Sequence, residues 1–540
     1  MFTKRLALMG MLFLFMFVSA CGTPATKQAP QKNNEPAATQ APAATEAPAY
    51  LPPAVILAPT AANSQSSIPS NNSNKNHPPS GSGQTPYDMF FQNYGVNPSI
   101  DTEDDHLSTF ALDVDTGSYT VMRNYLSDGN LPPKDSVRVE EYVNYFEQGY
   151  PNPPAHQAFG IYVDGAPTPF DQNERYQMLR IGIQGYAVPE EERKDASLTF
   201  VIDVSGSMSM DNRLGLVKRS LELLVEQLRP TDRVGIVVYG TEARVVLDST
   251  PGSDKRTILR AVDSLETEGS TNAEAGIRLG YKMAMRAFNP EGINRVILCS
   301  DGVANVGETG PDAILSEVKR YVDQGITLTT FGFGMSNYND TLMEQLADGG
   351  NGFYAYVDDI DEARRLFVEN LTSTLQVIAL NAKVQVDFNP DAVARYRLVG
   401  FENRAVADED FRNNKVDAGE IGAGHSVTAL YEIKLQPEAY GRIATVNLRW
   451  EDPDSHQIVE MSKDFDASAL ARDFHEASPY FQRAVVVSEY AEILRGSYWA
   501  EGSTFDDVYR EAQRVADFMP DDQAMTEFVD LVRQARRLND

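Results

Sequence analysis

Between residues 196 and 378, the hydrophobic positions follow two alternating patterns. Apolar residues first run without interruption and then recur with helical spacing, for example from Leu214 to Leu228. The uninterrupted runs lie at 198–203, 233–239, 296–298 and 326–333. Strands that are apolar on both faces are typical of a parallel sheet covered by helices. The segment therefore predicts an α/β domain with a doubly wound, mostly parallel sheet.

A different pattern flanks this domain on both sides. Apolar residues alternate with polar ones, which is the period of half-buried antiparallel strands. These alternating runs lie at 159–163, 179–183, 384–388, 427–435 and 444–450. Two or three strands alone make a marginal sheet, so we expect segments 156–195 and 379–466 to pair in one antiparallel β-domain. The α/β domain is then inserted in, or flanked by, this β-domain.

Helical spacing dominates both ends of the part that is expected to fold. Residues 86–155 combine one short strand with two helices. Residues 467–540 are helical, and Ser478-Pro479 is a good pair for an N-cap and a first helical turn. We therefore expect helical N- and C-terminal segments on either side of the β-domain.

Residues 1–20 are typical of an export signal. Lys4 and Arg5 precede an apolar run that is shorter than the ~20 residues needed to span a membrane. Small residues lead directly to Cys21, and this arrangement resembles a bacterial lipobox. By that resemblance, the cell cuts before Cys21 and attaches acyl chains such as palmitate. An ordinary signal peptide with an incidental cysteine is the alternative.

Residues 21–85 are rich in Pro, Ala, Thr, Gln, Asn and Ser. Such a composition cannot bury enough apolar surface to offset the entropy lost on ordering, so the stretch predicts a disordered tether. Several acyl chains anchor a protein stably where one does not. We expect a lipoprotein anchored to a membrane of the bacterial cell envelope, outside the cytoplasm.

The chain is strongly acidic. It has 47 Lys and Arg against 77 Asp and Glu residues, a net charge of −30. An acidic surface repels phosphate backbones, so nucleic acid is excluded as an expected partner. The second cysteine, Cys299, lies in an apolar run, and we expect a buried free thiol without a disulfide.

Oxygen-bearing side chains gather where strands of the α/β domain are predicted to end. Asp203, Ser205 and Ser207 alternate along a glycine-containing turn, Thr271 precedes a helix, and Asp301 follows another strand. In an open α/β sheet, ligands bind outside the carboxyl ends of the strands. Hard oxygen donors suit Mg²⁺, Mn²⁺ or Ca²⁺ rather than zinc. Ordinary helix capping is the alternative, but it does not explain five oxygens from three loops.

The order and context of these five residues resemble the metal ion-dependent adhesion site of von Willebrand factor A-type (VWA) domains. The resemblance implies a VWA fold, which is Rossmann-like, and one divalent metal, with Mg²⁺ first and Mn²⁺ or Ca²⁺ as alternatives. It also implies that neutral hydroxyls are the main protein ligands and that the carboxylates lie one layer further from the ion. Much of the ion's charge is then left for an external carboxylate.

Over residues 86–540, the chain also resembles the YfbK-like group of bacterial VWA proteins. The resemblance is carried by FALDVDTGSY at 110–119 and by DAGEIGAGH at 417–425. It implies a VWA-associated segment before the VWA domain at 196–378 and a C-terminal domain of unassigned function after it.

These features predict binding rather than catalysis. We expect a cell-envelope lipoprotein whose metal binds an exposed Asp or Glu of an envelope or extracellular protein. A scaffold whose metal only stabilises the fold is the alternative. A metal-dependent hydrolase is less favoured, because it needs a general base beside the ion and Asp203 and Asp301 are already assigned to the metal. We therefore expect no enzymatic activity.

Overall fold

The computed structural model describes residues 91–112, 115–170, 176–302, 311–334, 339–416 and 418–539. The predicted export signal, the predicted lipid site Cys21 and the predicted tether lie outside these ranges. Within the described ranges, no helix has the length and the apolar character needed to cross a membrane.

A six-stranded sheet forms the centre of the α/β domain. Its order is β10-β9-β8-β5-β6-β7, and only the edge strand β7 runs antiparallel to its neighbour. The strands are β5 (Ala196–Asp203), β6 (Arg233–Tyr239), β7 (Ala243–Pro251), β8 (Ile293–Ser300), β9 (Thr327–Gly332) and β10 (Tyr354–Tyr356). The hydrophobic pattern did not predict β7 and β10, because β7 is partly exposed and mixed in polarity and β10 is very short.

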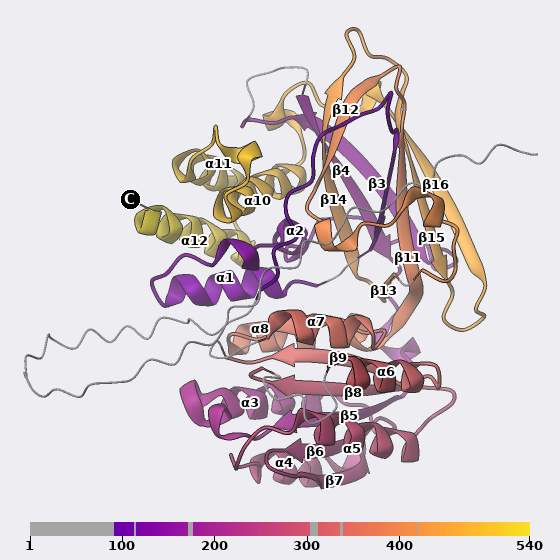
Figure 1. Ribbon diagram of the computed structural model, residues 1–540, viewed down its shortest axis with the longest axis vertical. Helices are drawn as coiled ribbons and strands as arrows, with labels where there is room; N and C mark the ends of the chain where they lie inside the picture. The colour runs from indigo at the N-terminus through magenta and orange to yellow at the C-terminus, as the bar shows by residue number, and fades with distance from the viewer. Residues whose placement is uncertain are drawn as a thin grey trace, which may run out of the picture. The chain divides into compact units, whose positions relative to one another are not determined.

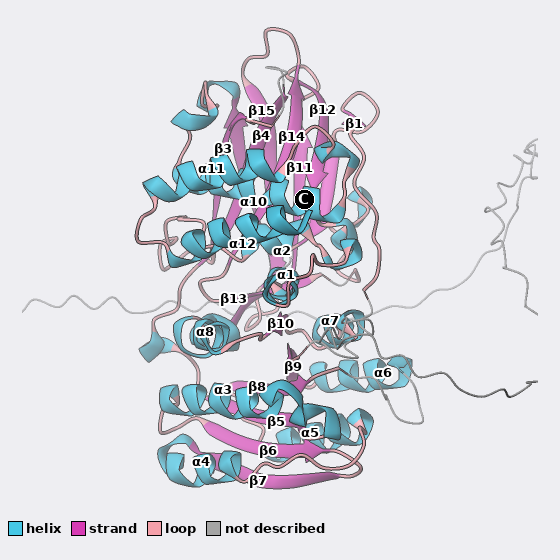
Figure 2. Cartoon of the chain, turned by 90° about the vertical axis from the view of Figure 1, so that its left-hand side faces the viewer, coloured by secondary structure: helices cyan, strands magenta, loops and turns pink. Residues whose placement is uncertain are grey.

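Helices cover both faces of this sheet (Figure 2). Alternate residues of β5 point to opposite sides, so that Phe200 lies in one core and Val201 in the other. One face carries α3 (Arg213–Gln227), α4 (Lys255–Asp263), α8 (Ile360–Arg364), the π-helical turn η5 (Arg365–Glu369) and α9 (Leu371–Leu375). The other face carries α5 (Ala273–Arg286), α6 (Pro311–Val322) and α7 (Asp340–Asp348). The predicted fold class, a doubly wound α/β sheet with antiparallel β-structure, is confirmed.

Two antiparallel sheets pack around a further core. One sheet has the order β1-β12-β14-β4-β3, and the other has the order β13-β11-β15-β16 with β2 also paired to β11. The first contains β1 (Ile100–Asp101), β3 (Phe159–Pro167), β4 (Tyr176–Gly185), β12 (Val393–Val399) and β14 (Ser426–Leu435). The second contains β2 (Leu107–Ala111), β11 (Val377–Phe388), β13 (Gly419–Gly422), β15 (Arg442–Glu451) and β16 (Ile458–Asp466). Side chains from both sheets, such as Ile181 of β4 and Val446 of β15, fill the core between them.

The α/β domain is inserted in this β-domain. Strand β4 precedes the α/β domain in the sequence and β14 follows it, yet the two are hydrogen-bonded neighbours with Ile181 opposite Ala429. The chain therefore leaves the sandwich after β4 and returns to it in β11. The exit after β4 lies in the first sheet, and the return in β11 lies in the second.

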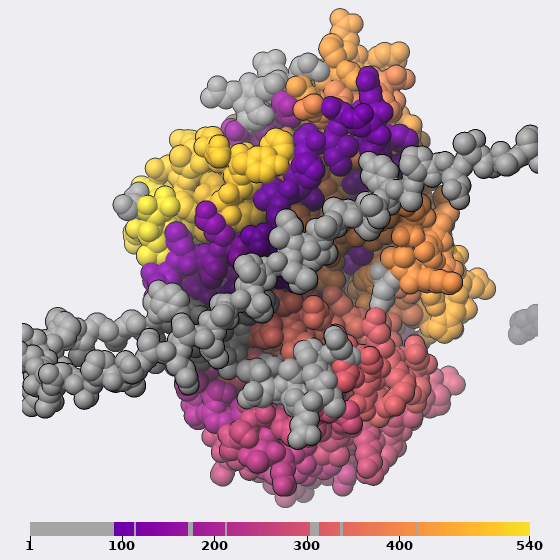
Figure 3. All heavy atoms as spheres, viewed as in Figure 1, coloured from indigo at the N-terminus to yellow at the C-terminus, as the bar shows by residue number. Residues whose placement is uncertain are grey.

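The two helical ends of the chain share a core of their own. Helices α1 (Gly117–Ser127) and α2 (Val139–Asn144) pack with α10 (Pro479–Arg495), α11 (Phe505–Phe518) and α12 (Gln523–Asn539). Figures 1 and 3 show the yellow C-terminal helices beside the purple N-terminal segment. The ring of Tyr119, fully buried in α1, stacks on Tyr145 with 4.0 Å between centroids. The sequence did not predict that these two distant segments form one helical layer.

Candidate metal centre

The turn after β5 brings two serine hydroxyls together. Asp203 ends β5 and is fully buried, and the backbone N–H of Ser205 donates to its Oδ1 across 2.8 Å. That bond folds the turn back on the strand, so that Ser205 Oγ and Ser207 Oγ lie 3.1 Å apart. A 3-10 turn, η3 (Gly206–Asn212), then leads into α3. The sequence DVSGS thus places alternate side chains on one side of a tight turn.

Both carboxylate oxygens of Asp203 are held by the protein. Ser205 occupies Oδ1, and the hydroxyl of Ser300 at the end of β8 donates to Oδ2 across 3.0 Å. Burial raises the pKa of Asp203 to about 6, the nearby charge of Asp301 adds to the rise, and the hydrogen bonds from Ser205 and Ser300 oppose it. A carboxylate buried in this way is stabilised by a nearby cation.

Asp301 has a cationic partner inside the protein. Arg213, the first residue of α3, donates from Nη1 to Asp301 Oδ2 across 2.7 Å, and both side chains are buried. The arginine packs against the loop after β9, where a Cβ on Gly334 would lie 2.1 Å from Arg213 Nε. Only glycine leaves the guanidinium that space. The start of α3 and the loop after β9 thus help to fix the position of Asp301.

The loop that carries Thr271 is tied to the Asp203 loop through the backbone. Gly206 N–H donates across 3.1 Å to the carbonyl of Gly269, two residues before Thr271. Gly269 has a φ of +65°, and a Cβ there would lie 2.0 Å from Thr241 Oγ1, so a side chain is excluded. Asn272 then caps α5 by accepting from Ala275 N–H across 3.1 Å. Half-buried Thr271 therefore lies directly before the N-cap of α5.

The five predicted residues therefore lie on loops at one edge of the sheet. Hydrogen bonds join Asp203, Ser205 and Ser207 directly, and Ser300 and Arg213 link this group to Asp301. Thr271 is held through its loop backbone. In the described part of the chain, no three His, Cys, Asp or Glu side chains form a metal-binding cluster. Neutral hydroxyls with two carboxylates fit a small hard cation, not zinc.

Two residues of this centre were not predicted from the sequence. Ser300 precedes Asp301 and ends β8, and its place in an apolar strand indicates no role at the centre. Arg213 lies four residues before Val217, on the helical stripe that faces the core. An arginine on the face of a helix that is otherwise apolar indicates a buried ion pair.

The fold and this edge define a VWA domain. Residues 197–370 match the family described as "von Willebrand factor type A domain", and residues 85–180 match one described as "von Willebrand factor". Residues 373–442 and 436–538 match "Uncharacterized protein YfbK, C-terminal". VWA domains generally act in protein–protein interaction or adhesion, and they typically bind a divalent metal at such a site.

The chain belongs to the YfbK-like family of VWA proteins. It is 37% identical over 478 residues to "Uncharacterized protein YfbK" of Escherichia coli (strain K12), which covers 83% of this chain and 81% of that protein. It is 26% identical over 305 residues to "Uncharacterized protein sll0103" of Synechocystis, covering 55% and 70% of the two chains. A solved von Willebrand factor type A protein from Catenulispora acidiphila is 15% identical with a TM-score of 0.41, covering 72% and 91%.

Proposed function

We propose that the protein binds a protein partner through one divalent metal ion, for which Mg²⁺ is the favoured candidate. The partner supplies an Asp or Glu to the ion. The ion would be held by the five residues of the candidate centre, namely Asp203, Ser205, Ser207, Thr271 and Asp301. When bound, it would supply a Lewis-acidic position for an oxygen ligand from outside the chain.

The charge of the centre is the observation that carries this proposal. Two buried carboxylates, Asp203 and Asp301, and one buried guanidinium, Arg213, leave a single net negative charge. A divalent cation would reverse it to a single net positive charge, and one external carboxylate would neutralise it. Because Arg213 already balances Asp301, the protein does not neutralise the ion by itself.

The exposure of the side chains indicates the side from which a partner would approach the centre. Asp203 and Asp301 are buried, whereas Ser207 and Thr271 are half-exposed. A ligand from outside therefore meets the hydroxyl side of the centre. The net charge of −30 opposes an acidic partner only at a distance, because salt screens charges beyond ~8 Å at physiological ionic strength.

The proposed location rests on the first residues of the sequence. Cleavage before Cys21 and acylation there would anchor the protein in a bacterial cell-envelope membrane, with residues 21–85 as a tether. Replacing Cys21 with Ala should abolish labelling by a radiolabelled fatty acid. Label that persists in this variant would rule out Cys21 as the lipid site.

Metal binding can be measured directly by calorimetry. Asp301→Ala should lose Mg²⁺ binding, whereas Asp323→Ala, a change at an exposed acidic residue outside the centre, should keep it. Unchanged Mg²⁺ binding by Asp301→Ala would overturn the assignment of the centre.

Partner capture separates a binding function from a metal-stabilised scaffold. The chain is immobilised and exposed to cell-envelope extract with Mg²⁺ or after chelation. Capture should be lost on chelation and in Ser207→Ala, but kept in Ser209→Ala, which changes an exposed serine of the same turn. Circular dichroism should show a folded protein throughout. Equal capture in all samples would favour the scaffold.

A further inference from the structure

A polar pocket of about 290 Å³ lies where three segments of the chain meet. Its walls are residues 144–150 after α2, residues around η5 between 365 and 373, and residues 424–426 before β14. The helical layer, the α/β domain and the sandwich each contribute one wall. None of the pocket residues belongs to the candidate metal centre.

Both sequence signatures that the metal centre leaves unexplained reach this pocket. Thr116 belongs to the signature at 110–119, and Gly424 and His425 end the signature at 417–425. The two motifs are about three hundred positions apart in the sequence, yet they line the same cavity. Residues of both signatures therefore lie at one cavity.

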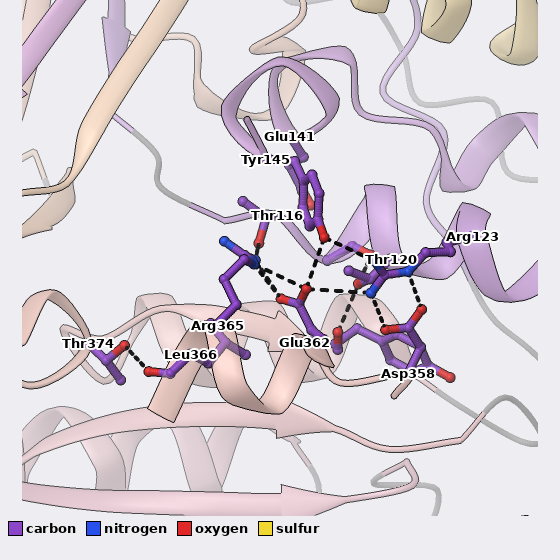
Figure 4. A network of polar contacts seen from close by, with 12 residues as sticks. Thr116, Thr120, Arg123, Glu141, Tyr145, Asp358, Glu362, Arg365, Leu366 and Thr374 are labelled. Atoms are coloured by element: carbon purple, nitrogen blue, oxygen red, sulfur yellow. Dashed lines mark hydrogen bonds and ion pairs between the residues drawn. The ribbon is translucent and has the colours of Figure 1, made fainter. Parts of the chain in front are cut away.

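Arg365 places a guanidinium at the wall. It begins η5, which is a π-helical turn. Such turns are rare in proteins, and those that occur often lie at functional sites. Its Nε donates to both oxygens of Glu362 at 3.1 Å, and its Nη2 donates to Thr116 Oγ1 across 3.2 Å. Among the described residues, Nη1 makes no hydrogen bond, and Figure 4 shows this nitrogen pointing away from Glu362. One edge of a held guanidinium is thus open to a ligand.

His425 adds a neutral polar wall. Its Nδ1 is buried without a partner among the described residues, and its ring meets Phe353 edge to face at 6.3 Å. Burial lowers the pKa of His425 to about 4, and the charges of Arg365 and Arg295 add to this effect. The ring is therefore uncharged at neutral pH and contributes a polar atom but no charge to the pocket.

Two further hydrogen-bonding side chains line the same wall. The amide of Asn370 and the hydroxyl of Ser373 make no hydrogen bonds to the described part of the protein. Glu147 is the acidic residue of the lining, and it is exposed, whereas Arg365 is partly buried. The wall around η5 therefore offers a cation and neutral donors.

We propose that this pocket binds a small acid, whose carboxylate or phosphate oxygens accept hydrogen bonds from Arg365 Nη1, Asn370 and Ser373. A planar guanidinium recognises such oxyanions well, because its donors match their geometry. The ligand would bind the folded protein and not the unfolded chain, so its binding should raise the melting temperature. This site is independent of the metal centre.

The experiment uses the full chain freed of metal by chelation and dialysis, so that acids do not bind at the metal centre. Calorimetry and thermal unfolding are run with succinate, with inorganic phosphate and with succinamide, a neutral analogue of succinate. Binding of succinate or phosphate without binding of succinamide supports the proposal and tells a carboxylate ligand from a phosphate ligand. Equal binding of succinamide, or binding of neither acid at millimolar concentration, overturns it.

A charge variant locates the binding. Arg365→Gln would leave Glu362 buried without this partner and risks unfolding, so Asn370→Asp is used. This isosteric change puts a carboxylate beside Arg365 and should weaken acid binding at least tenfold. Asn130→Asp, outside the pocket, should leave it unchanged. Unweakened binding in Asn370→Asp overturns the site. Mg²⁺ affinity should be equal in both variants. A failure of the acid-binding proposal can therefore be distinguished from a failure of the metal-centre proposal.

Discussion

Arg213 Nη1 lies 2.7 Å from Asp301 Oδ2 in an ion pair that is almost completely buried, with the side chains 4% and 5% exposed. The pair joins the start of α3 to the end of β8. It is the contact that decides how much charge the candidate metal centre presents to the outside. A buried ion pair contributes little net stability, but removing one partner is costly. The pair is therefore better understood as part of the centre than as a stabilising device.

Arg213→Gln tests this relationship. Without metal, the variant should be less stable by about 3–5 kcal/mol, because Asp301 is left buried without its counter-charge. Mg²⁺ should restore part of this loss, so the rise in melting temperature on adding Mg²⁺ should exceed that of the unchanged protein. Thermal unfolding with and without Mg²⁺ measures both effects. Arg219→Gln, an exposed arginine on the same helix, is the control. Identical Mg²⁺ shifts in the three proteins would contradict the role of Arg213.

A half-buried carboxyl in α10, that of Glu489, predicts a pH dependence of stability. Burial raises the pKa of Glu489 from 4.5 to about 7, against the hydrogen bond from Ser503 and the charge of Arg397. The folded protein therefore holds this proton more tightly than the unfolded chain does. The resulting stabilisation is complete below the unfolded pKa and is lost as pH rises through the folded pKa, by about 3 kcal/mol.

Urea unfolding between about pH 4 and pH 8 measures this effect as the difference in the free energy of unfolding between the unchanged protein and Glu489→Gln. The unchanged protein should lose stability relative to that variant as the pH rises. Glu501→Gln, at an exposed position, should follow the unchanged protein. A difference that grows in the opposite direction would show that Glu489 is ionised in the fold.

Arg123 of α1 holds the helical layer to the α/β domain (Figure 4). Its Nε and Nη2 donate to the two oxygens of Asp358, each across 2.6 Å, and Glu362 lies 3.5 Å from Nη2. Arg123→Gln should cost about 3–5 kcal/mol, because it leaves these buried carboxylates short of a counter-charge. Amide hydrogen exchange should accelerate in α1. Arg510→Gln breaks an exposed pair and should cost at most about 1 kcal/mol.

Truncation tests the shared sheet. Residues 190–380 contain the whole six-stranded sheet and should fold alone. Residues 380–540 lose β3 and β4, so that β14 would become an open edge, and they should be unstable or aggregate. Melting followed by circular dichroism distinguishes the two fragments. A cooperative melt of 380–540 by itself would contradict the dependence of β14 on β4.

The sequence alone determined the α/β domain and predicted the residues of the candidate metal centre. Runs such as 198–203 are apolar because both faces of β5 are buried, so consecutive residues of the sequence indicate the burial of the strand. Asp203, Ser205 and Ser207 follow that strand within one turn, and the ends of parallel strands lie on one edge, which made the centre predictable.

The sequence predicted that the flanking strands pair, but only the tertiary structure decided their register and the shared core of the two helical ends. Nothing local in Tyr119 indicates that its core contains Phe528, and the register of Ile181 against Ala429 depends on a pairing across the whole inserted domain. The same holds for Arg213, whose helix pattern indicates burial but not its partner Asp301. Local patterns encode which face of an element is buried, whereas the choice of partner depends on contacts between residues far apart in the sequence.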